Sequence, residues 1–151
     1  FPDASFDIAI SRFSVHHWPR PESAFREIRR VVRPGGRLAA VDLLAPEDGP
    51  LDTFVHAVEL LRDPSHARSM RVSEWLALLG TAGFAAHLER AWELEHDVET
   101  WLAQTAPDGW RADAVRALLR DAQPAAREHF RIAPDASTFR VGCGLIVATR
   151  A

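Results

Sequence analysis

The sequence predicts an α/β fold that begins with a strand, a helix and a second strand. The segment Phe6–Arg12 contains the apolar run Ile8–Ile10, which is typical of a strand buried on both faces of a parallel sheet. Residues 21–32 place apolar side chains at helical spacing, and Pro34-Gly35-Gly36 is expected to stop that helix. The apolar run Leu38–Val41 then indicates a second strand, parallel to the first because a strand–helix–strand unit makes a right-handed crossover.

The rest of the chain alternates between helical and extended patterns. Further helices are expected over 51–61, from a cap at Ser73 to Gly80, after a cap at Asp97, over 111–121, and from Pro124 onward. Extended patterns over 84–94 and 138–149 predict the last two strands. Residues 97–132 are therefore interpreted as a helical insertion between those two strands, forming a lid or a dimer contact.

Composition narrows the range of function classes. The 151 residues are 47% apolar, which is enough for the core of a single domain, and the net charge is −3 without a basic stripe. We therefore expect no nucleic-acid partner. No apolar stretch approaches the roughly 18 residues that span a bilayer, and no signal-peptide pattern is visible, so no membrane association is expected. Cys143 is the single cysteine, which excludes an intrachain disulfide and fits a cytoplasmic location.

Several features of residues 1–44 resemble one known family in their order and spacing. They are Phe6–Ile10, the pair His16-His17, the amphipathic helix, Arg33-Pro34-Gly35-Gly36, and the strand that ends in Val41-Asp42. Together they resemble the second half of a class I S-adenosylmethionine-dependent methyltransferase, of the ubiquinone/menaquinone-biosynthesis type. Residues 51–66 are also similar to the helix after the fifth strand in one bacterial subgroup.

The resemblance implies a partial Rossmann-like methyltransferase sheet. It would hold strands four to seven, the last antiparallel, with flanking helices and the helical insertion. The glycine-rich turn and the ribose-binding acid belong to the first half of such sheets, and residues 1–151 contain no G-x-G-x-G. We therefore expect a C-terminal portion of a methyltransferase domain, inactive alone, with an exposed edge at its first strand through which copies self-associate. Arg20 stands where the family commonly has the N-cap Asp.

The resemblance also implies which residues meet S-adenosylmethionine. Ser11, Arg12 and Phe13 would line its methionine end, with Arg12 pairing with the carboxylate. Phe13 or Trp18 would offer a ring face to the sulfonium cation, and Trp18 would contact the acceptor. The alternative is that Phe13, Val15 and Trp18 only pack the helix onto the sheet.

Histidines are the candidate acid–base groups. His16 and His17 suit a general base or an acceptor-binding group, and as neighbours on irregular backbone we expect them to point in different directions. No Cys, Asp or Glu lies nearby at metal-ligand spacing, so no metal site is predicted. His66 is placed at the cleft as a catalytic or substrate-binding residue. Asp42 either orients cofactor or substrate at the end of its strand or accepts hydrogen bonds from loop amides.

The predicted function is methyl transfer from S-adenosylmethionine to the C, O or N atom of a small-molecule acceptor by the intact protein. Two alternatives stay open. One is a non-catalytic α/β module that pairs with a partner chain through its exposed sheet edge. The other is half of a nucleotide-dependent oxidoreductase.

Overall fold

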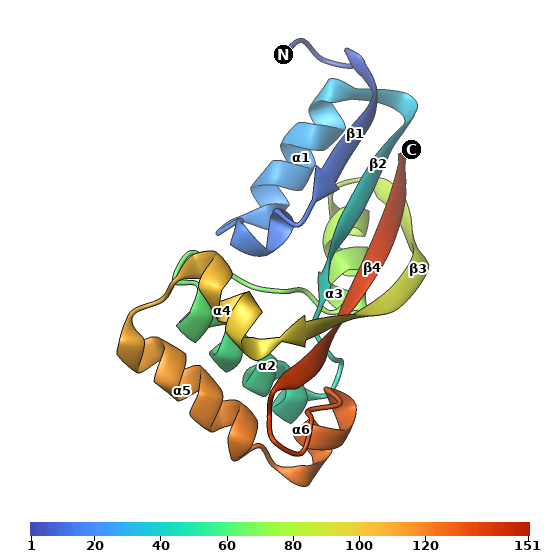
Figure 1. The fold of residues 1–151 in the computed structure, drawn as a ribbon. Coiled ribbons are helices and arrows are strands. Elements are labelled where there is room, and N and C mark those ends of the chain that lie inside the picture. The colour runs from blue at the N-terminus through green and yellow to red at the C-terminus, as the bar shows by residue number, and fades with distance from the viewer. The chain divides into compact units, whose positions relative to one another are not determined.

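The computed structural model describes all 151 residues. Its elements are β1 (Phe6–Arg12), the 3-10 helix η1 (Val15–His17), α1 (Pro21–Val31), β2 (Val32–Leu44), α2 (Gly49–Arg62), α3 (Val72–Thr81), β3 (Phe84–Asp97), α4 (Val98–Thr105), α5 (Gly109–Arg120), α6 (Pro124–His129) and β4 (Thr138–Arg150). The strands form one sheet in the order β1-β2-β4-β3. β1 and β2 are parallel, and β4 runs in the opposite direction to both (Figure 1). The expected α/β class and the antiparallel last strand are confirmed.

The chain divides into two compact units, which are described separately. The first contains residues 1–44, 67–92 and 143–151, and the second contains residues 45–66 and 93–142. The long strands β3 and β4 contribute residues to both units. None of the helices has the length and apolar character that crossing a bilayer requires.

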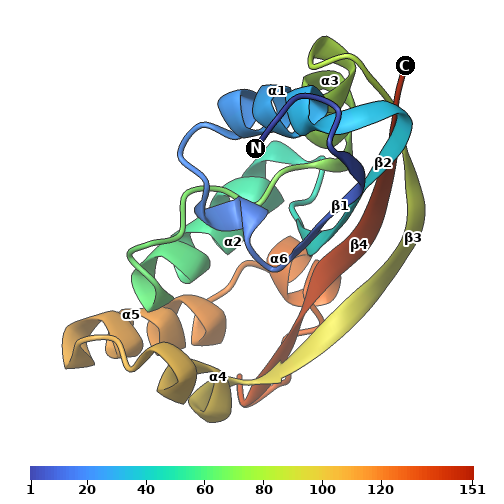
Figure 2. The same cartoon turned by 90° about the horizontal axis from the view of Figure 1, so that it is seen from above.

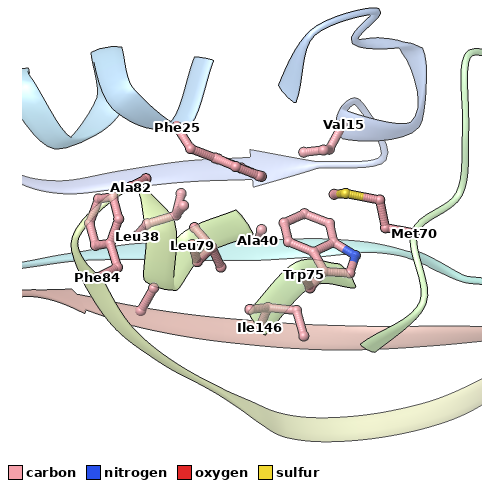
Figure 3. Close-up of a cluster of buried hydrophobic side chains, with 11 residues drawn as sticks. Val15, Phe25, Leu38, Ala40, Met70, Trp75, Leu79, Ala82, Phe84 and Ile146 are labelled. Carbon is pink, nitrogen blue, oxygen red and sulfur yellow. The ribbon is translucent and has the colours of Figure 1, made fainter. Parts of the chain in front are cut away.

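The core of the first unit lies between the sheet and two helices, α1 and α3, on the same face (Figure 2). Phe25 of α1 and Trp75 of α3 are almost completely buried, and their ring centroids are 5.5 Å apart. Leu38 of β2 and Ile146 of β4 complete the contact from the sheet (Figure 3). Burial of these large apolar side chains is the main force that holds the unit together.

The turn from α1 into β2 differs from the prediction. The helix ends at Val31, before Pro34-Gly35-Gly36, and these three residues lie inside β2. Phe6 pairs with Val32 but Ile8 pairs with Arg37, so a step of two residues in β1 matches a step of five in β2, and the extra residues form a bulge. Gly35 has a φ of +73°, and a Cβ on Gly36 would lie 2.8 Å from the carbonyl oxygen of Asp7. Glycine is therefore required by close backbone approach, not as a helix stop.

β1 is the first strand of the sheet order and has no neighbour on its outer side. Ile8 and Ile10 are 49% and 74% exposed, so the prediction of a strand buried on both faces is wrong for these two side chains. Ala9, which points the other way, packs against the core. The expected exposed sheet edge is thus present in the structure.

Other predicted boundaries were confirmed or shifted slightly. The Asp97 carboxylate accepts a hydrogen bond from the Thr100 amide at 2.9 Å and caps α4, and Pro124 opens α6, both as predicted. The predicted cap at Ser73 is wrong, because α3 begins at Val72 after Arg71. There the Glu74 carboxylate accepts from the Arg71 amide at 2.9 Å. Arg20 precedes α1, and its side chain does not cap the helix, because a guanidinium has no hydrogen-bond acceptor for the helix amides.

The second unit contains α2 and the three helices between β3 and β4. The Asp48 carboxylate caps α2 by accepting from the Leu51 amide at 3.1 Å. Phe54 and Phe130 have ring centroids 5.5 Å apart. Trp101 is 3% exposed and stacks edge-on against Phe139, 4.9 Å between centroids. Trp101 is therefore a core residue of this unit.

Arg150 of the last strand binds the C-terminal end of α1. Its Nη1 donates to the carbonyl oxygens of Arg29 at 2.8 Å and Val32 at 2.6 Å. Carbonyls in the last turn of a helix have no partner within the helix, so Arg150 satisfies groups that would otherwise need water.

Arg150→Ala is expected to lower the free energy of unfolding by about 1–3 kcal/mol, because a charged donor is lost from partly buried carbonyls. Urea titration followed by circular dichroism measures the change. The matched control is Arg120→Ala, which removes an exposed arginine paired with Asp121 and should cost under about 1 kcal/mol. Equal effects of the two substitutions would contradict this role of Arg150.

Candidate functional site

The site is built on a sharp turn after β1. Phe13 adopts a φ of 47°, in the left-handed region that residues other than glycine seldom occupy. Its amide donates to the Val41 carbonyl of β2 at 2.9 Å, which ties the turn to the neighbouring strand. Strained backbone of this kind is typical of functional loops held by their surroundings.

A buried carboxylate near the end of β2 holds the loop that follows this turn. Asp42 is 2% exposed. It accepts from the amides of Val15 at 2.7 Å, Ser14 at 3.3 Å and Leu43 at 2.8 Å. Its remaining partner is Nδ1 of His16, at 2.5 Å from Oδ1. Of the two predicted roles for Asp42, the one as acceptor of loop amides is thus present, together with a contact to an imidazole.

The contact to Asp42 sets the tautomer of His16. Because a carboxylate only accepts hydrogen bonds, Nδ1 of the neutral ring carries the proton and Nε2 is the nitrogen able to take one. The His16 side chain is 12% exposed. Its backbone carbonyl accepts from the amides of Ala67 at 2.8 Å and Arg68 at 3.0 Å, which anchors the segment before α3 to η1.

The ring of His17 lies against that of His16. Their centroids are 4.2 Å apart with the planes tilted by 46°. The two rings are therefore in contact, contrary to the prediction that the side chains point in different directions.

A hollow of about 480 Å³ lies beside β1 and α1 in the first unit. Ser11, Arg12, Ser14 and Trp18 contribute to its lining at the carboxyl end of β1. The Ser11 hydroxyl oxygen is buried without a hydrogen-bond partner. Arg12 is exposed, with its guanidinium carbon 5.0 Å from the centre of the Phe13 ring. The structure thus brings a buried hydroxyl and a cation to one hollow.

Trp18 packs in the core and also lines a hollow. Its indole Nε1 donates to the Ser14 hydroxyl at 3.1 Å, and its ring lies 6.0 Å from that of Phe25 in the core. It also lines the hollow beside Ser11. Packing on the helix and lining an open space are therefore compatible for this residue.

His66 belongs to the second unit, unlike the other predicted site residues. It is 6% exposed, its amide donates to the Asp63 carbonyl at 3.0 Å, and its ring centroid is 5.6 Å from that of His56. Sequence analysis missed the polar residues near it: His56 Nδ1 is 2.9 Å from Oδ1 of Asp52, a buried carboxylate. Their i,i+4 spacing on α2 is the signal that would have found this pair.

Cys143 is fully buried in β4. Burial raises the pKa of its thiol to about 11, with a further contribution from the negative charge of Asp42. The thiol is therefore protonated at neutral pH and is no nucleophile.

Comparison with known proteins identifies relatives. Residues 1–40 match the family described as "Methyltransferase domain". The chain is 35% identical to the Escherichia coli protein YafE over 135 residues, which are 89% of this chain and 65% of YafE. It is 37% identical over 132 residues to the Bacillus subtilis methyltransferase YcgJ, covering 87% of this chain and 52% of that protein. The chain therefore spans about half to two thirds of the length of these curated relatives.

Solved structures share the fold along the whole chain. The crystal structure of YcgJ from Bacillus subtilis superposes with a TM-score of 0.95 at 33% identity, covering 99% of this chain and 66% of that one. A Bacillus halodurans protein described as a methyltransferase gives 0.94 at 29% identity, covering 99% and 72%. At 16% identity and a TM-score of 0.58, an arsenic(III) S-adenosylmethionine methyltransferase from Chlamydomonas reinhardtii shares the fold alone, over 99% of this chain and 39% of that one.

Asp42→Ala is expected to destabilise the protein by at least about 2 kcal/mol, because it leaves several buried donors without an acceptor. Asp48→Ala is the matched control: it removes a carboxylate of the same kind from an exposed helix cap and should cost about 1 kcal/mol. Urea unfolding compares the two. A ¹⁵N NMR spectrum of the His16 ring in Asp42→Asn and wild type adds a local measurement. An unchanged stability in Asp42→Ala would show that the loop does not depend on this carboxylate.

Proposed function

We propose that this chain, which has the class I methyltransferase fold and is related in sequence to its members, supplies the acceptor-side residues of an S-adenosylmethionine-dependent methyltransferase. The acceptor is a small molecule methylated at C, O or N. The observation that supports this best is the His16–Asp42 pair at the carboxyl ends of two parallel strands, where open α/β sheets bind their ligands. The ubiquinone/menaquinone-type acceptor expected from the sequence stays a prediction.

The hollow at the end of β1 suits the amino-acid end of the cofactor. A buried hydroxyl without a partner, Ser11 Oγ, is satisfied when a polar ligand atom reaches it. The exposed Arg12 guanidinium supplies the charge complementary to a carboxylate. Phe13, whose ring centre lies 5.0 Å from the guanidinium carbon of Arg12, is proposed to line the methionine end beside them. When bound, S-adenosylmethionine supplies an electrophilic methyl group on a sulfonium.

His16 acts as the general base for acceptors that must lose a proton. Its Nε2 would accept the proton that the acceptor atom loses as that atom bonds to the methyl group, while the bond from the methyl group to the sulfonium sulfur would break and leave a neutral thioether. Asp42 is a positioning residue: it holds the ring in one tautomer and stabilises the imidazolium that forms. Proton transfer by a positioned side chain contributes about 10²–10⁴-fold to a rate. His17 is proposed to contact the acceptor, and the role of His66 stays a prediction.

The exposed edge of β1 is where further strands of the sheet add. Ile8 and Ile10 expose apolar side chains on one face of this strand, and the curated relatives are longer than this chain. The added segment supplies the glycine-rich turn and the acid for the ribose hydroxyls. Residues 1–151 alone are therefore expected to bind the cofactor weakly. The insertion 97–132 remains a proposed lid or dimer contact, and its exposed aromatic residue is Trp110, 61% exposed.

Arg12→Ala in the intact protein is expected to weaken binding of S-adenosylhomocysteine about tenfold or more, because a charged hydrogen bond to the carboxylate is lost. His16→Asn, which keeps a donor toward Asp42 but has no base, should leave that affinity unchanged and lower transfer of a tritiated methyl group to a panel of phenols and amines. Calorimetry and scintillation counting measure the two effects.

Residues 1–151 alone serve as the reference in this titration and should bind at least about a hundredfold more weakly. If residues 1–151 bound S-adenosylhomocysteine with micromolar affinity at one site per chain, the proposal that an added segment provides part of the cofactor site would be contradicted. Unchanged cofactor affinity in Arg12→Ala would remove Arg12 from the site.

Copies of residues 1–151 are expected to self-associate through β1, because an unpaired apolar edge is a template for strand pairing. Ile10→Lys should shift the chain toward monomer in sedimentation velocity runs over a range of concentrations. Leu60→Lys is the matched control, since it replaces a 51% exposed apolar residue that belongs to α2 and not to β1. A chain that stays monomeric at all concentrations would rule out pairing through this edge.

A further inference from the structure

The first unit contains a second hollow, of about 400 Å³, between η1, the beginning of α1, and the segment 67–78. Its apolar lining comes from Val15, Trp18, Met70, Ala77 and Leu78. We infer that this hollow, here named the α1–α3 pocket, binds an uncharged apolar group of the methyl acceptor, such as an aromatic ring. This inference rests on the proposed function, and it adds the chemical class of the substrate.

The walls of the α1–α3 pocket are fixed before any ligand binds. Val15 is 3% exposed and its amide is held by Asp42, and Met70 is 5% exposed and bridges to Leu44 of β2. Trp18 is fixed by the hydrogen bond to Ser14. Val15 and Met70 lie at the same end of the buried cluster as Trp75 (Figure 3). A preformed apolar pocket of a few hundred Å³ is typical of small-molecule sites.

Trp18 connects this pocket to the hollow at the end of β1. It is the residue that the linings of the two hollows share. Ser11 and Arg12, the proposed cofactor residues, line the hollow at the end of β1, and the apolar side chains line the α1–α3 pocket. His16, the proposed base, lies in the chain between Val15 and Trp18, two residues of the pocket wall. A molecule seated in the α1–α3 pocket is therefore next to the loop that carries the base.

The charges around the α1–α3 pocket favour a neutral ligand. Arg68 is the positive group of the lining, and its Nη2 lies 3.0 and 3.1 Å from the two carboxylate oxygens of Glu74. Glu22, an exposed carboxylate, is the remaining charged residue of the lining. The guanidinium charge is therefore balanced and one negative charge remains, which disfavours an anionic group.

The test uses a pair of naphthylamine dyes with the purified chain and no cofactor. N-phenyl-1-naphthylamine is uncharged and fluoresces in apolar sites, and 1-anilinonaphthalene-8-sulfonate has the same rings with a sulfonate. Ala77 is exposed on α3 and lines the pocket, so Ala77→Phe fills the pocket from its rim without opening the core. Ala103→Phe on α4 is the matched control, an exposed helical alanine outside the pocket lining.

The neutral dye should bind wild type and Ala103→Phe equally, and Ala77→Phe at least tenfold more weakly. The sulfonate dye should bind wild type more weakly than the neutral dye, and Glu22→Gln should strengthen it severalfold. Thermal unfolding of each variant confirms that it is folded. Equal binding of the neutral dye to the two phenylalanine variants would overturn the inference that the α1–α3 pocket binds an uncharged apolar group.

The failure of this inference can be told apart from failure of the proposed function. Dye binding is measured without cofactor, whereas the Arg12 and His16 variants are read out by cofactor affinity and methyl transfer. Ala77→Phe should leave the affinity of the intact protein for S-adenosylhomocysteine unchanged. A loss of that affinity in Ala77→Phe would overturn the assignment of this pocket to the acceptor.

Discussion

The carboxylate of Asp42 is the interaction on which the candidate site depends. It accepts from three backbone amides and one imidazole while being 2% exposed. The loop after β1 has too few residues in regular structure to satisfy its own amides, and its left-handed residue Phe13 is unfavourable by itself. A buried, fully hydrogen-bonded carboxylate offsets both costs and selects one conformation of the loop. The conformation of the loop and the orientation of the imidazole thus depend on the same carboxylate.

The same loop takes part in the core, so stability and function share residues. Val15 packs in the cluster with Phe25 and Trp75, and it also lines the α1–α3 pocket. Trp18 combines contact with Phe25 and exposure to two hollows. A substitution that enlarges the pocket at Val15 would therefore also loosen the packing of α1 on the sheet, since core packing tolerates little change in volume. Exposed positions such as Ala77 separate the two effects.

Local signals allowed much of the fold to be predicted from sequence. Periodicity placed α1 and the strands, and the caps at Asp97 and Pro124 depend on neighbours within a few residues. The bulge in β2 was missed because it depends on pairing with β1, which no local pattern reveals. The exposure of Ile10 was missed for a similar reason, because it depends on the position of β1 at the edge of the sheet. For the site, the residue types after β1 were recognisable, whereas the segment 67–78 was not: it reaches the loop through the His16 carbonyl, about fifty residues away in the sequence.

The bulge at Pro34-Gly35-Gly36 limits which length changes β2 can accept. Leu38, Ala40 and Asp42 alternate along β2 and are all buried. Side chains alternate between the two faces of a sheet, so deleting Arg37, which separates the bulge from Leu38, would turn all three to the opposite face. The acid would then leave His16 and its loop. Length changes in this stretch are therefore excluded more strictly than substitutions are, and insertions are expected only in the connections on either side of it.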